Sequence, residues 1–262
     1  MRTIAIGDVH GCSDELRALL DLVEYRQGVD DALVVGDLVD RGPDSVGVIA
    51  LCMERGVRAI MGNHDEKHVR HARNLARHPD SRVGFSGEEE KGMWSHMTDV
   101  QRDWLSSLPD HAVLGPRLVA VHAGMLPGIP LERQPQRALH RLRYVERRTR
   151  KDGTEAWEMA RMRITDDNGF LRPRGSVPWT EVYDGAKDVV YGHWARDEVE
   201  LTGWSEWPRC YGIDTSACFG GRLTAVVFSE PGNDGRQPWE LASVKSGFSD
   251  HRDRFHEGEY DP

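Results

Sequence analysis

The stretch Ile6-Gly-Asp-Val-His-Gly11 decides the fold, because it follows directly on a short apolar run near the start of the chain. Residues 2–6 read as a buried β-strand. Asp8 and His10 lie two positions apart, so on an extended chain both side chains leave from one face. A carboxylate oxygen and an imidazole nitrogen that point the same way suit a borderline divalent metal ion.

Four later stretches share this character, with glycine beside a polar side chain that can bind a metal. They are Gly36-Asp-Leu-Val-Asp-Arg-Gly42, Gly62-Asn-His-Asp65, His122-Ala-Gly124 and Gly192-His193. Four of the five motifs come where an apolar, strand-like run gives way to glycine and a polar residue, and the other begins there with histidine. Together they predict that several strands bring metal-binding side chains to one place.

The first part of the chain alternates between strand-like and helix-like runs. Strands are expected at 2–6, 31–35 and 57–61, with a helix capped by Ser13 after the first and a helix opened by Pro43 after the second. Such alternation is typical of a parallel sheet whose ligand loops cluster at the carboxyl ends of the strands. The predicted fold class is α/β.

The rest of the chain is expected to complete one metal-binding domain at residues 1–245. A hairpin at 112–121 and a strand at 188–191 should deliver His122 and His193, and strands at 199–201, 210–213, 222–228 and 241–244 should form an antiparallel second sheet. An arginine-rich insertion at about 125–187 should lie over the site. Residues 246–262 read as a charged, frayed tail.

Composition excludes several classes of protein. The net charge of −9 argues against a protein that coats duplex nucleic acid or a membrane surface, and no apolar run has the roughly 18–20 residues of a membrane helix. The strand pattern begins at once and leaves no room for a signal peptide. Cys12, Cys52, Cys210 and Cys218 show no close pairing and read as reduced thiols, so we expect a cytoplasmic location.

Polar residues after residue 65 have an ordinary interpretation. His68, His71 and His78 read as a solvated helix face, with metal binding as the minority interpretation. For the arginines of the insertion, a solvated helix face and a phosphate-binding surface are equally weighted. An acidic protein that gathers arginine beside a phosphate site would have an electrostatic reason to do so.

The polar residues at the strand ends favour a pair of metal ions. They are all oxygen or imidazole donors, which suits Mn²⁺, Fe or Zn²⁺ better than a thiolate zinc site. Six ligands exceed what one ion with open positions would use, so two ions that share a carboxylate, most naturally Asp37, account for the surplus. The six are Asp8, His10, Asp37, Asn63, His122 and His193.

Charge counting then indicates the reaction. Two divalent ions bring four positive charges, of which Asp8 and Asp37 neutralise two. The remaining charge can bind phosphate and acidify a bridging water, and two ions ~3.5–4 Å apart can clamp an in-line displacement. The predicted reaction is hydrolysis of a phosphoester or phosphoanhydride by direct attack of a bridging hydroxide, without a covalent enzyme intermediate.

These motifs, in this order, resemble those of the calcineurin-like metallophosphoesterases, and more narrowly those of the phosphoprotein phosphatase branch. Tyr191-Gly-His-Trp194 and residues 213–225 are similar to the symmetrical diadenosine tetraphosphatases of bacteria. The resemblance covers roughly residues 1–228 and implies a two-sheet sandwich flanked by helices. Asp40 before Arg41 is the protein-phosphatase form of the second motif, and Thr215-Ser-Ala stands where the tetraphosphatases usually show Thr-Gly-Cys.

The resemblance also implies roles for single residues. One metal would be held by Asp8, His10 and Asp37, and the other by Asp37, Asn63, His122 and His193. His64 would be the general acid, Asp40 would hold its imidazole, and Arg41 would grip the phosphoryl oxygens. Further phosphate contacts are expected from Arg163 and, less directly, from Arg161 or Arg143.

Several functions are compatible with these residues. The leading hypothesis is a hydrolase of dinucleoside polyphosphates such as diadenosine tetraphosphate, with two divalent ions, most naturally Mn²⁺, as cofactors. A Ser/Thr protein phosphatase is the alternative, favoured by the Asp40–His64 pair, and removal of terminal phosphates from RNA 5′ ends is a third option. A nucleotide-binding protein without turnover would commonly have lost a ligand or the acid, and none is missing here.

Overall fold

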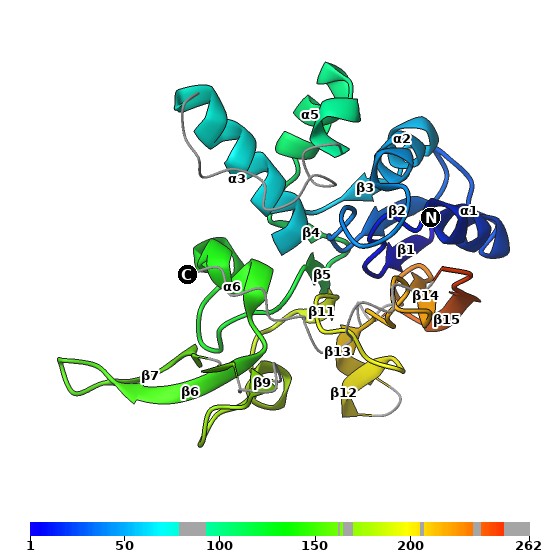
Figure 1. Cartoon of the computed structure of the whole chain (residues 1–262). Coiled ribbons are helices and arrows are strands. Elements are labelled where there is room, and N and C mark those ends of the chain that lie inside the picture. Colours follow the sequence, from blue (N-terminus) through cyan, green and yellow to red (C-terminus); the bar gives the residue numbers. More distant parts are fainter. Residues whose placement is uncertain (79–92, 162, 165–169, 205–206, 233–236, 249–262) are drawn as a thin grey trace.

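Two five-stranded sheets face each other in the computed structural model of the chain (Figure 1). The structure describes residues 1–78, 93–161, 163–164, 170–204, 207–232 and 237–248. Ala5 and Leu33 from one sheet belong to the same buried cluster as Ala120, Val190 and others from the second sheet. The two sheets therefore pack face to face, which confirms the predicted α/β sandwich flanked by helices.

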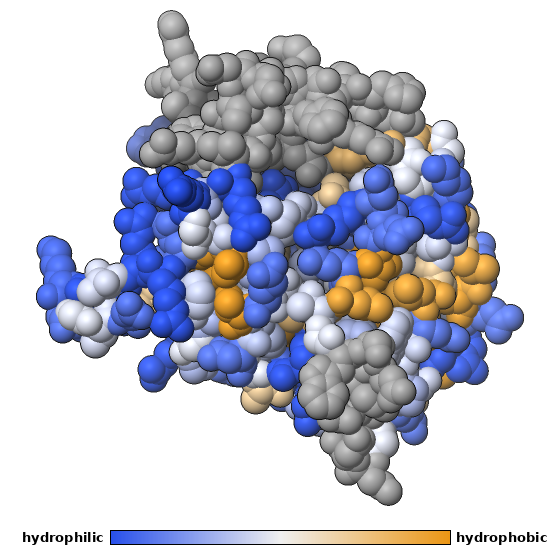
Figure 2. Space-filling model, turned by 90° about the horizontal axis from the view of Figure 1, so that it is seen from below, coloured by the Kyte–Doolittle hydropathy of each residue, from blue (hydrophilic) through white to orange (hydrophobic). Residues whose placement is uncertain are grey.

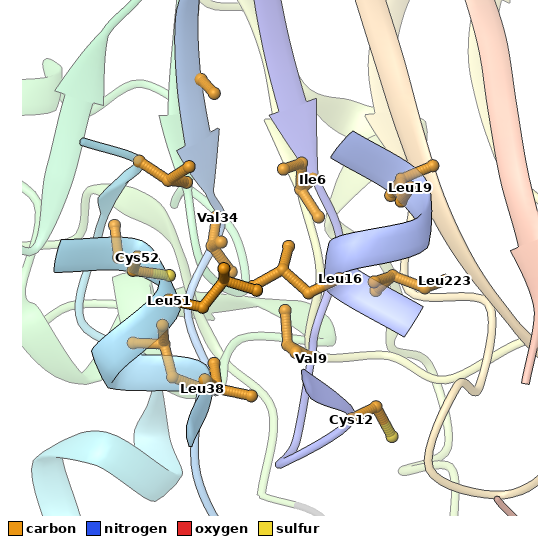
Figure 3. Close-up of a cluster of buried hydrophobic side chains, with 14 of the residues drawn as sticks. Ile6, Val9, Cys12, Leu16, Leu19, Val34, Leu38, Leu51, Cys52 and Leu223 are labelled. Carbon is orange, nitrogen blue, oxygen red and sulfur yellow. The ribbon is translucent and has the colours of Figure 1, made fainter. Parts of the chain in front are cut away.

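The first sheet contains the predicted parallel strands. In order across the sheet, its strands are β15 (Trp239–Lys245), β14 (Arg222–Phe228), β1 (Thr3–Ile6), β2 (Asp31–Val34) and β3 (Arg58–Ala59). The last three are parallel neighbours. Helices α1 (Ser13–Leu22) and α2 (Ser45–Arg55) connect them. Figure 3 shows Leu16 of α1 beside Leu51 of α2, over strand residues Ile6 and Val34. This packing fixes the strand ends from which the first two ligand loops leave.

Helix α1 begins at Ser13 but is not capped by it, and α2 begins at Ser45 rather than at Pro43. Ser13 is already inside α1, and its hydroxyl donates to Asp44 Oδ2 at 2.9 Å instead of capping its own helix. Asp44, rather than Pro43, caps α2 and accepts a hydrogen bond from the backbone N–H of Gly47 at 2.8 Å. Ser13 is diverted because Asp44 brings a carboxylate acceptor to the start of α1.

The second sheet has the order β12-β13-β11-β5-β4 and is mixed. The hairpin of β4 (His111–Val113) and β5 (Leu118–Val121) is present as predicted. Strand β11 (Asp188–Tyr191) runs parallel to β5 and to β13 (Trp207–Gly212), which pairs with β12 (Glu200–Trp204). Because β5 and β11 are parallel neighbours, His122 and His193, which follow them, leave from the same end of this sheet.

The predicted antiparallel second sheet is therefore wrong. Strands β14 (Arg222–Phe228) and β15 (Trp239–Lys245) join the first sheet, with Ile6 opposite Ala225 and Phe228 opposite Trp239. Strand β13 lies parallel to β11. Strand β14 is buried along nearly its whole length and lies between β15 and β1, so it is an interior strand of the first sheet.

The described residues between 125 and 187 form a layer on the outer side of the second sheet. It contains a three-stranded sheet of β10 (Val177–Pro178), β6 (Tyr144–Thr149) and β7 (Glu155–Met159). Val145 of β6 belongs to the same buried cluster as Val121 and Tyr191, and the β6–β7 hairpin projects away from the body (Figure 1). Figure 2 shows that the hairpin, at the left of that view, is largely hydrophilic. The elements are η1 (Leu131–Arg133), α6 (Gln136–Arg141), β6 (Tyr144–Thr149), β7 (Glu155–Met159), β8 (Arg163–Ile164), β9 (Phe170–Leu171), β10 (Val177–Pro178) and η2 (Trp179–Val182).

Two more helices, α3 (Asn63–Arg77) and α5 (Asp99–Ser106), follow β3 in the chain and lie beside each other (Figure 1). At the end of the described chain, Ser246 is buried and its hydroxyl donates to Glu15 Oε1 at 2.9 Å. Residues 249–262 of the predicted tail lie outside the described residues. Among the helices that the structure describes, none has the length and apolar character needed to cross a membrane.

Candidate metal centre

The five sequence motifs meet at one end of the two sheets. The loops after β1, β2 and β3 come from the first sheet, and the loops after β5 and β11 come from the second. Because both sets of strands present their carboxyl ends to the same place, their side chains converge. The residues brought together are Asp8, His10, Asp37, Asp40, Arg41, Asn63, His64, His122 and His193.

Asp37 lies at the centre of this cluster. Its Oδ2 atom is 3.5 Å from His10 Nε2 and 3.3 Å from His122 Nε2, so it faces a histidine from each sheet. Two groups of potential ligand atoms, each with all atoms within 4.8 Å of one another, contain Asp37: one with His10 and His64, and one with His122 and His193. A single carboxylate is thus shared by two metal-sized groups of donors.

Asn63 joins the second group through its side-chain carbonyl. Its Oδ1 atom lies 3.0 Å from His122 Nε2 and 2.8 Å from His193 Nδ1. Asn63 is the first residue of α3, directly after the β3 loop. A neutral oxygen between two imidazoles gives this group the mixed oxygen and nitrogen donors that first-row divalent ions accept.

Asp8 lies against the backbone of the last motif. Its Oδ2 atom accepts a hydrogen bond from the backbone N–H of His193 at 2.9 Å, so it joins the first and last motifs of the chain. A Cβ atom on Gly192 would overlap Asp8 Oδ1, which explains glycine at that position. The first group consists of His10, Asp37 and His64, and Asp8 is not a member of it.

Backbone carbonyls orient two of the imidazoles. His10 Nδ1 donates to the carbonyl of Val39 at 2.8 Å, and His122 Nδ1 donates to the carbonyl of Val35 at 3.0 Å. Each bond fixes the tautomer with the proton on Nδ1, and Nε2 then faces Asp37 with its lone pair. Both acceptors belong to the loop after β2, so the same loop supplies Asp37 and aims its neighbours.

Burial favours the neutral form of two of the ligand imidazoles, His10 and His193. It lowers the pKa of His10 to about 3, and together with Arg143 and His122 it holds the pKa of His193 well below its usual value. Burial alone would raise the pKa of Asp37, but the histidines around it, His122 first, outweigh burial and keep the pKa well below its usual range. A carboxylate among neutral imidazoles is the protonation state that binds a divalent cation.

His64 has the opposite electrostatic character. Burial would lower its pKa, but Asp37 and Asp40 outweigh that effect and raise it. Its Nδ1 donates to Asp40 Oδ2 at 2.7 Å, while Arg41 Nη2 lies 3.3 Å from its Nε2. Charging of this ring therefore adds a proton at Nε2, because Nδ1 already carries one.

The sequence-based interpretation of His68 as a solvated residue is wrong. Its side chain is fully buried, and its Nε2 lies 2.6 Å from Asp40 Oδ1. The spacing of His64 and His68 by four positions on α3, which puts both on one face, was a usable signal. His78 is exposed, as predicted.

Asp65 is a second residue that sequence reasoning missed. It is fully buried and accepts hydrogen bonds from the backbone N–H of Leu38 at 3.0 Å and of Gly62 at 2.9 Å. Burial and the nearby charge of Asp37 raise its pKa to about 7. It ties the loop after β2 to the start of α3, and its position two residues after a predicted ligand pointed to such a role.

The ligand loops contain strained backbone. His10, Asp37, Asp40, Arg41 and His193 all have left-handed φ values, between 45° and 69°. Non-glycine residues rarely adopt this region, and such residues gather at functional sites because surrounding contacts hold them there. The strain thus falls on predicted site residues in three of the five motifs.

The predicted phosphate-binding arginines lie in different surroundings. Arg41 is half-buried, with its guanidinium carbon 5.0 Å from the centre of the Phe219 ring, and Arg143 Nη2 donates to the carbonyl of His193 at 3.2 Å. Arg161 is exposed and has no contact with the cluster among the described residues. Arg163 belongs to β8, but its side chain lies outside the described part of the structure.

The model of one family, described as calcineurin-like phosphoesterase, matches residues 1–197. The chain belongs to this family. A symmetrical bis(5′-nucleosyl)-tetraphosphatase from Paracidovorax citrulli is 30% identical, over 87% of this chain and 92% of its own length. A tetraphosphatase of the same name from Methylobacillus flagellatus is 29% identical, over 92% and 95%.

Solved structures agree with this family. The crystal structure of a proposed diadenosine tetraphosphatase has a TM-score of 0.69 and 29% identity, covering 94% of this chain and 93% of that one. A serine/threonine phosphatase from Saccharomyces cerevisiae has a TM-score of 0.58 at 14% identity, covering 94% and 80%, and shares the fold. This calcineurin-like phosphoesterase is thus a hydrolase related to the symmetrical tetraphosphatases, with His/Asp clusters as its candidate metal site.

Proposed function

We propose that the protein is a dinuclear-metal phosphohydrolase that cleaves dinucleoside polyphosphates, with diadenosine tetraphosphate as the representative substrate. The observation that carries this proposal is the position of Asp37 between two groups of donors. A carboxylate that faces a histidine from each sheet is suited to bridge two cations. The names of the nearly full-length relatives support the substrate class.

The donor set fits two divalent ions. We propose Asp8, His10 and Asp37 for one, with Asp37, Asn63, His122 and His193 for the other. Carboxylate, amide and neutral imidazole donors suit Mn²⁺, which we propose as the native ion, over Fe or Zn²⁺. When bound, two such ions supply Lewis acidity toward phosphoryl oxygens and lower the pKa of water.

The protein's own residues then orient the phosphate and move a proton. We propose that His64, charged at Nε2, gives its proton to the leaving oxygen, while Asp40 holds Nδ1 and stabilises the charge. Arg41 would donate two hydrogen bonds to phosphoryl oxygens, and its guanidinium lies over the ring of Phe219. His64→Ala should retain bound metal and reduce turnover by roughly 10²–10⁴-fold, the range of general acid–base catalysis.

Aromatic and cationic side chains beside His193 support a nucleoside substrate. Half-buried Tyr144 and Trp194 meet edge to face with ring centres 4.9 Å apart, and the guanidinium carbon of Arg196 lies 4.1 Å from the centre of the Trp194 ring. Aromatic faces of this kind bind bases by stacking. We propose Arg143, Arg163 and Arg161 for the phosphates between the two nucleosides.

Product analysis tests the substrate and the cleavage position. The protein would be incubated with Mn²⁺ and diadenosine tetraphosphate, and the nucleotides separated by chromatography. Two molecules of ADP are the expected product of symmetrical cleavage, whereas AMP with ATP would indicate asymmetrical cleavage. No nucleotide product, together with release of phosphate from a simple phosphoester, would overturn the substrate assignment and keep the metal chemistry.

A Ser/Thr protein phosphatase is the second candidate. The observation in its favour is the short contact between Asp40 and His64, since Asp40 gives the second motif the form that protein phosphatases have. A phosphopeptide assayed beside diadenosine tetraphosphate discriminates the two, and activity on the peptide alone would favour this candidate.

We also propose a cytoplasmic location, because all four cysteines are free.

A further inference from the structure

We propose that His68 is a positioning residue that fixes the Asp40 carboxylate for its work on His64. The inference rests on the proposed function, in which His64 protonates the leaving oxygen. His68 neither touches the substrate nor carries a proton in the reaction. It acts through Asp40, from the side of the carboxylate that faces away from His64.

The geometry assigns one imidazole to each oxygen of Asp40. His64 Nδ1 lies 2.7 Å from Oδ2, and His68 Nε2 lies 2.6 Å from Oδ1. Both distances are at the short end for N–H···O bonds, as expected where the acceptor is an ionised carboxylate. A carboxylate held at both oxygens has a single orientation, and that orientation points Oδ2 at His64.

Burial makes the bond from His68 hard to replace. The side chain of His68 is fully buried, and that of Asp40 is 11% exposed. If the Nε2–H donor were removed, little water could reach Oδ1, and a buried carboxylate oxygen would lack its partner. The expected response is rotation of the carboxylate toward solvent or toward another donor.

The backbone hydrogen bonds of Asp40 do not involve its carboxylate, and the N–H of Gly42 donates to its carbonyl at 2.8 Å. Its φ is 69°, in a loop outside helix and sheet, and its N–H donates to the Ser45 hydroxyl at 3.1 Å. The direction of the side chain is therefore set mainly by the two imidazoles that bind it. His68 comes from the middle of α3, a regular element, so it links the loop to a rigid support.

A comparison of two substrates separates positioning from simple stabilisation. Phenyl phosphate and 4-nitrophenyl phosphate have similar shapes. Phenolate is the more basic leaving group and needs protonation as it leaves, whereas 4-nitrophenolate leaves without it. His68→Leu should lower kcat for phenyl phosphate by about 10- to 100-fold, the range for removal of an outer-shell partner. The loss for 4-nitrophenyl phosphate should be several times smaller.

The conservative variant provides a rescue. In His68→Gln the side-chain amide nitrogen can reach the position of Nε2 and donate to Asp40. We expect most of the activity on phenyl phosphate to return. Equal losses for both substrates in the Leu variant, or no difference between the Leu and Gln variants, would overturn the proposal.

His140 offers a matched control. It is also buried, and its Nε2 lies 2.9 Å from Asp110 Oδ1, a histidine–carboxylate bond away from the cluster. His140→Leu should lower the free energy of unfolding and leave the ratio of the two kcat values unchanged. A shift of that ratio in the control would show that loss of any buried histidine produces the effect.

Two further measurements distinguish this inference from the proposed function. His64→Ala should lose more activity on phenyl phosphate than on 4-nitrophenyl phosphate. Equal losses in His64→Ala would refute the assignment of His64 as the acid. Unequal losses in His64→Ala with equal losses in His68→Leu would refute only the positioning role of His68. Crystal structures of wild type and His68→Leu give an answer without any substrate. The proposal predicts that Asp40 turns away from His64 Nδ1, and an unchanged contact near 2.7 Å would overturn it.

Discussion

The guanidinium carbon of Arg41 lies 5.0 Å from the centre of the Phe219 ring. The two residues belong to the second motif and to the segment before β14, so the far end of the chain supports a proposed phosphate-binding residue. Phe219 is 6% exposed, and its ring limits where the guanidinium can move. An arginine held on a ring in this way loses less conformational freedom when it binds a phosphate.

Phe219→Leu tests this support. The substitution keeps an apolar side chain and removes the ring, so we expect a cost of about 0.5–1 kcal/mol in substrate binding, or about a two- to sixfold rise in KM with a smaller change in kcat. Tyr25→Leu is the control, because it removes a ring from beneath Arg55, away from the cluster. An unchanged KM would mean that Phe219 only fills space.

Asp37→Ala should release metal from the whole site. The shared carboxylate contributes to both donor groups, so its loss weakens both. Since removal of an outer-shell partner already costs about 10- to 100-fold, we expect activity to fall by more than about 100-fold. Metal content after dialysis, measured by mass spectrometry, is the readout. Asp31→Asn, which breaks an exposed ion pair with Arg58, should retain its metal; full metal in Asp37→Ala would refute the bridging assignment.

Tyr144→Leu should weaken binding of a nucleoside. Stacking of a base on an aromatic ring contributes about 1–3 kcal/mol, so KM for diadenosine tetraphosphate should rise by about 5- to 150-fold. KM for 4-nitrophenyl phosphate should stay close to its wild-type value, since that substrate has no base. Trp157→Leu removes another ring next to an arginine, Arg147 on the β6–β7 hairpin, and serves as the control. A parallel rise for both substrates would rule out base binding.

Acid should remove the stabilisation that Asp30 provides. Arg2 donates to Asp30 at 2.8 and 3.2 Å, and this pairing holds the pKa of the carboxyl well below its ordinary value of 3.8 despite burial. A depressed pKa adds stability above the ordinary value, and this stability is lost as pH falls below it. Asp30→Asn should cost about 1–3 kcal/mol at pH 7 and pH 5, and less at pH 3.

Urea unfolding at the three pH values measures this difference. Asp21→Asn, at an exposed position on α1, is the control and should show little change at any pH. A cost for Asp30→Asn that stayed constant down to pH 3 would contradict the assigned ion pair.

The parallel half of the first sheet and the convergence of the five motifs were predictable, because both depend on short local patterns. Each ligand follows an apolar strand, and strand direction then determines where the ligands meet. The membership of β14 was not predictable in this way. Its apolar run fits either sheet, and its pairing with β1 depends on contacts between opposite ends of the chain.

His68 shows a different limit of sequence reasoning. On α3 it lies among lysine, arginine and further histidines, which is the pattern of a solvated face. Its partner Asp40 comes from a loop 28 residues earlier in the sequence. Polar residues that are buried for a site look like surface residues until their partner is known.

The left-handed backbone of five non-glycine site residues lowers the stability of the folded protein at the residues that the proposed reaction needs. Each such residue carries a conformational penalty of order 1 kcal/mol, which glycine would relieve. Selection for melting temperature alone would thus favour glycine at position 41 over position 40, because the Asp40 carboxylate also binds two buried imidazoles. Ageing or heating should likewise relax these loops before the sandwich itself melts, so loss of turnover would precede loss of the circular-dichroism signal.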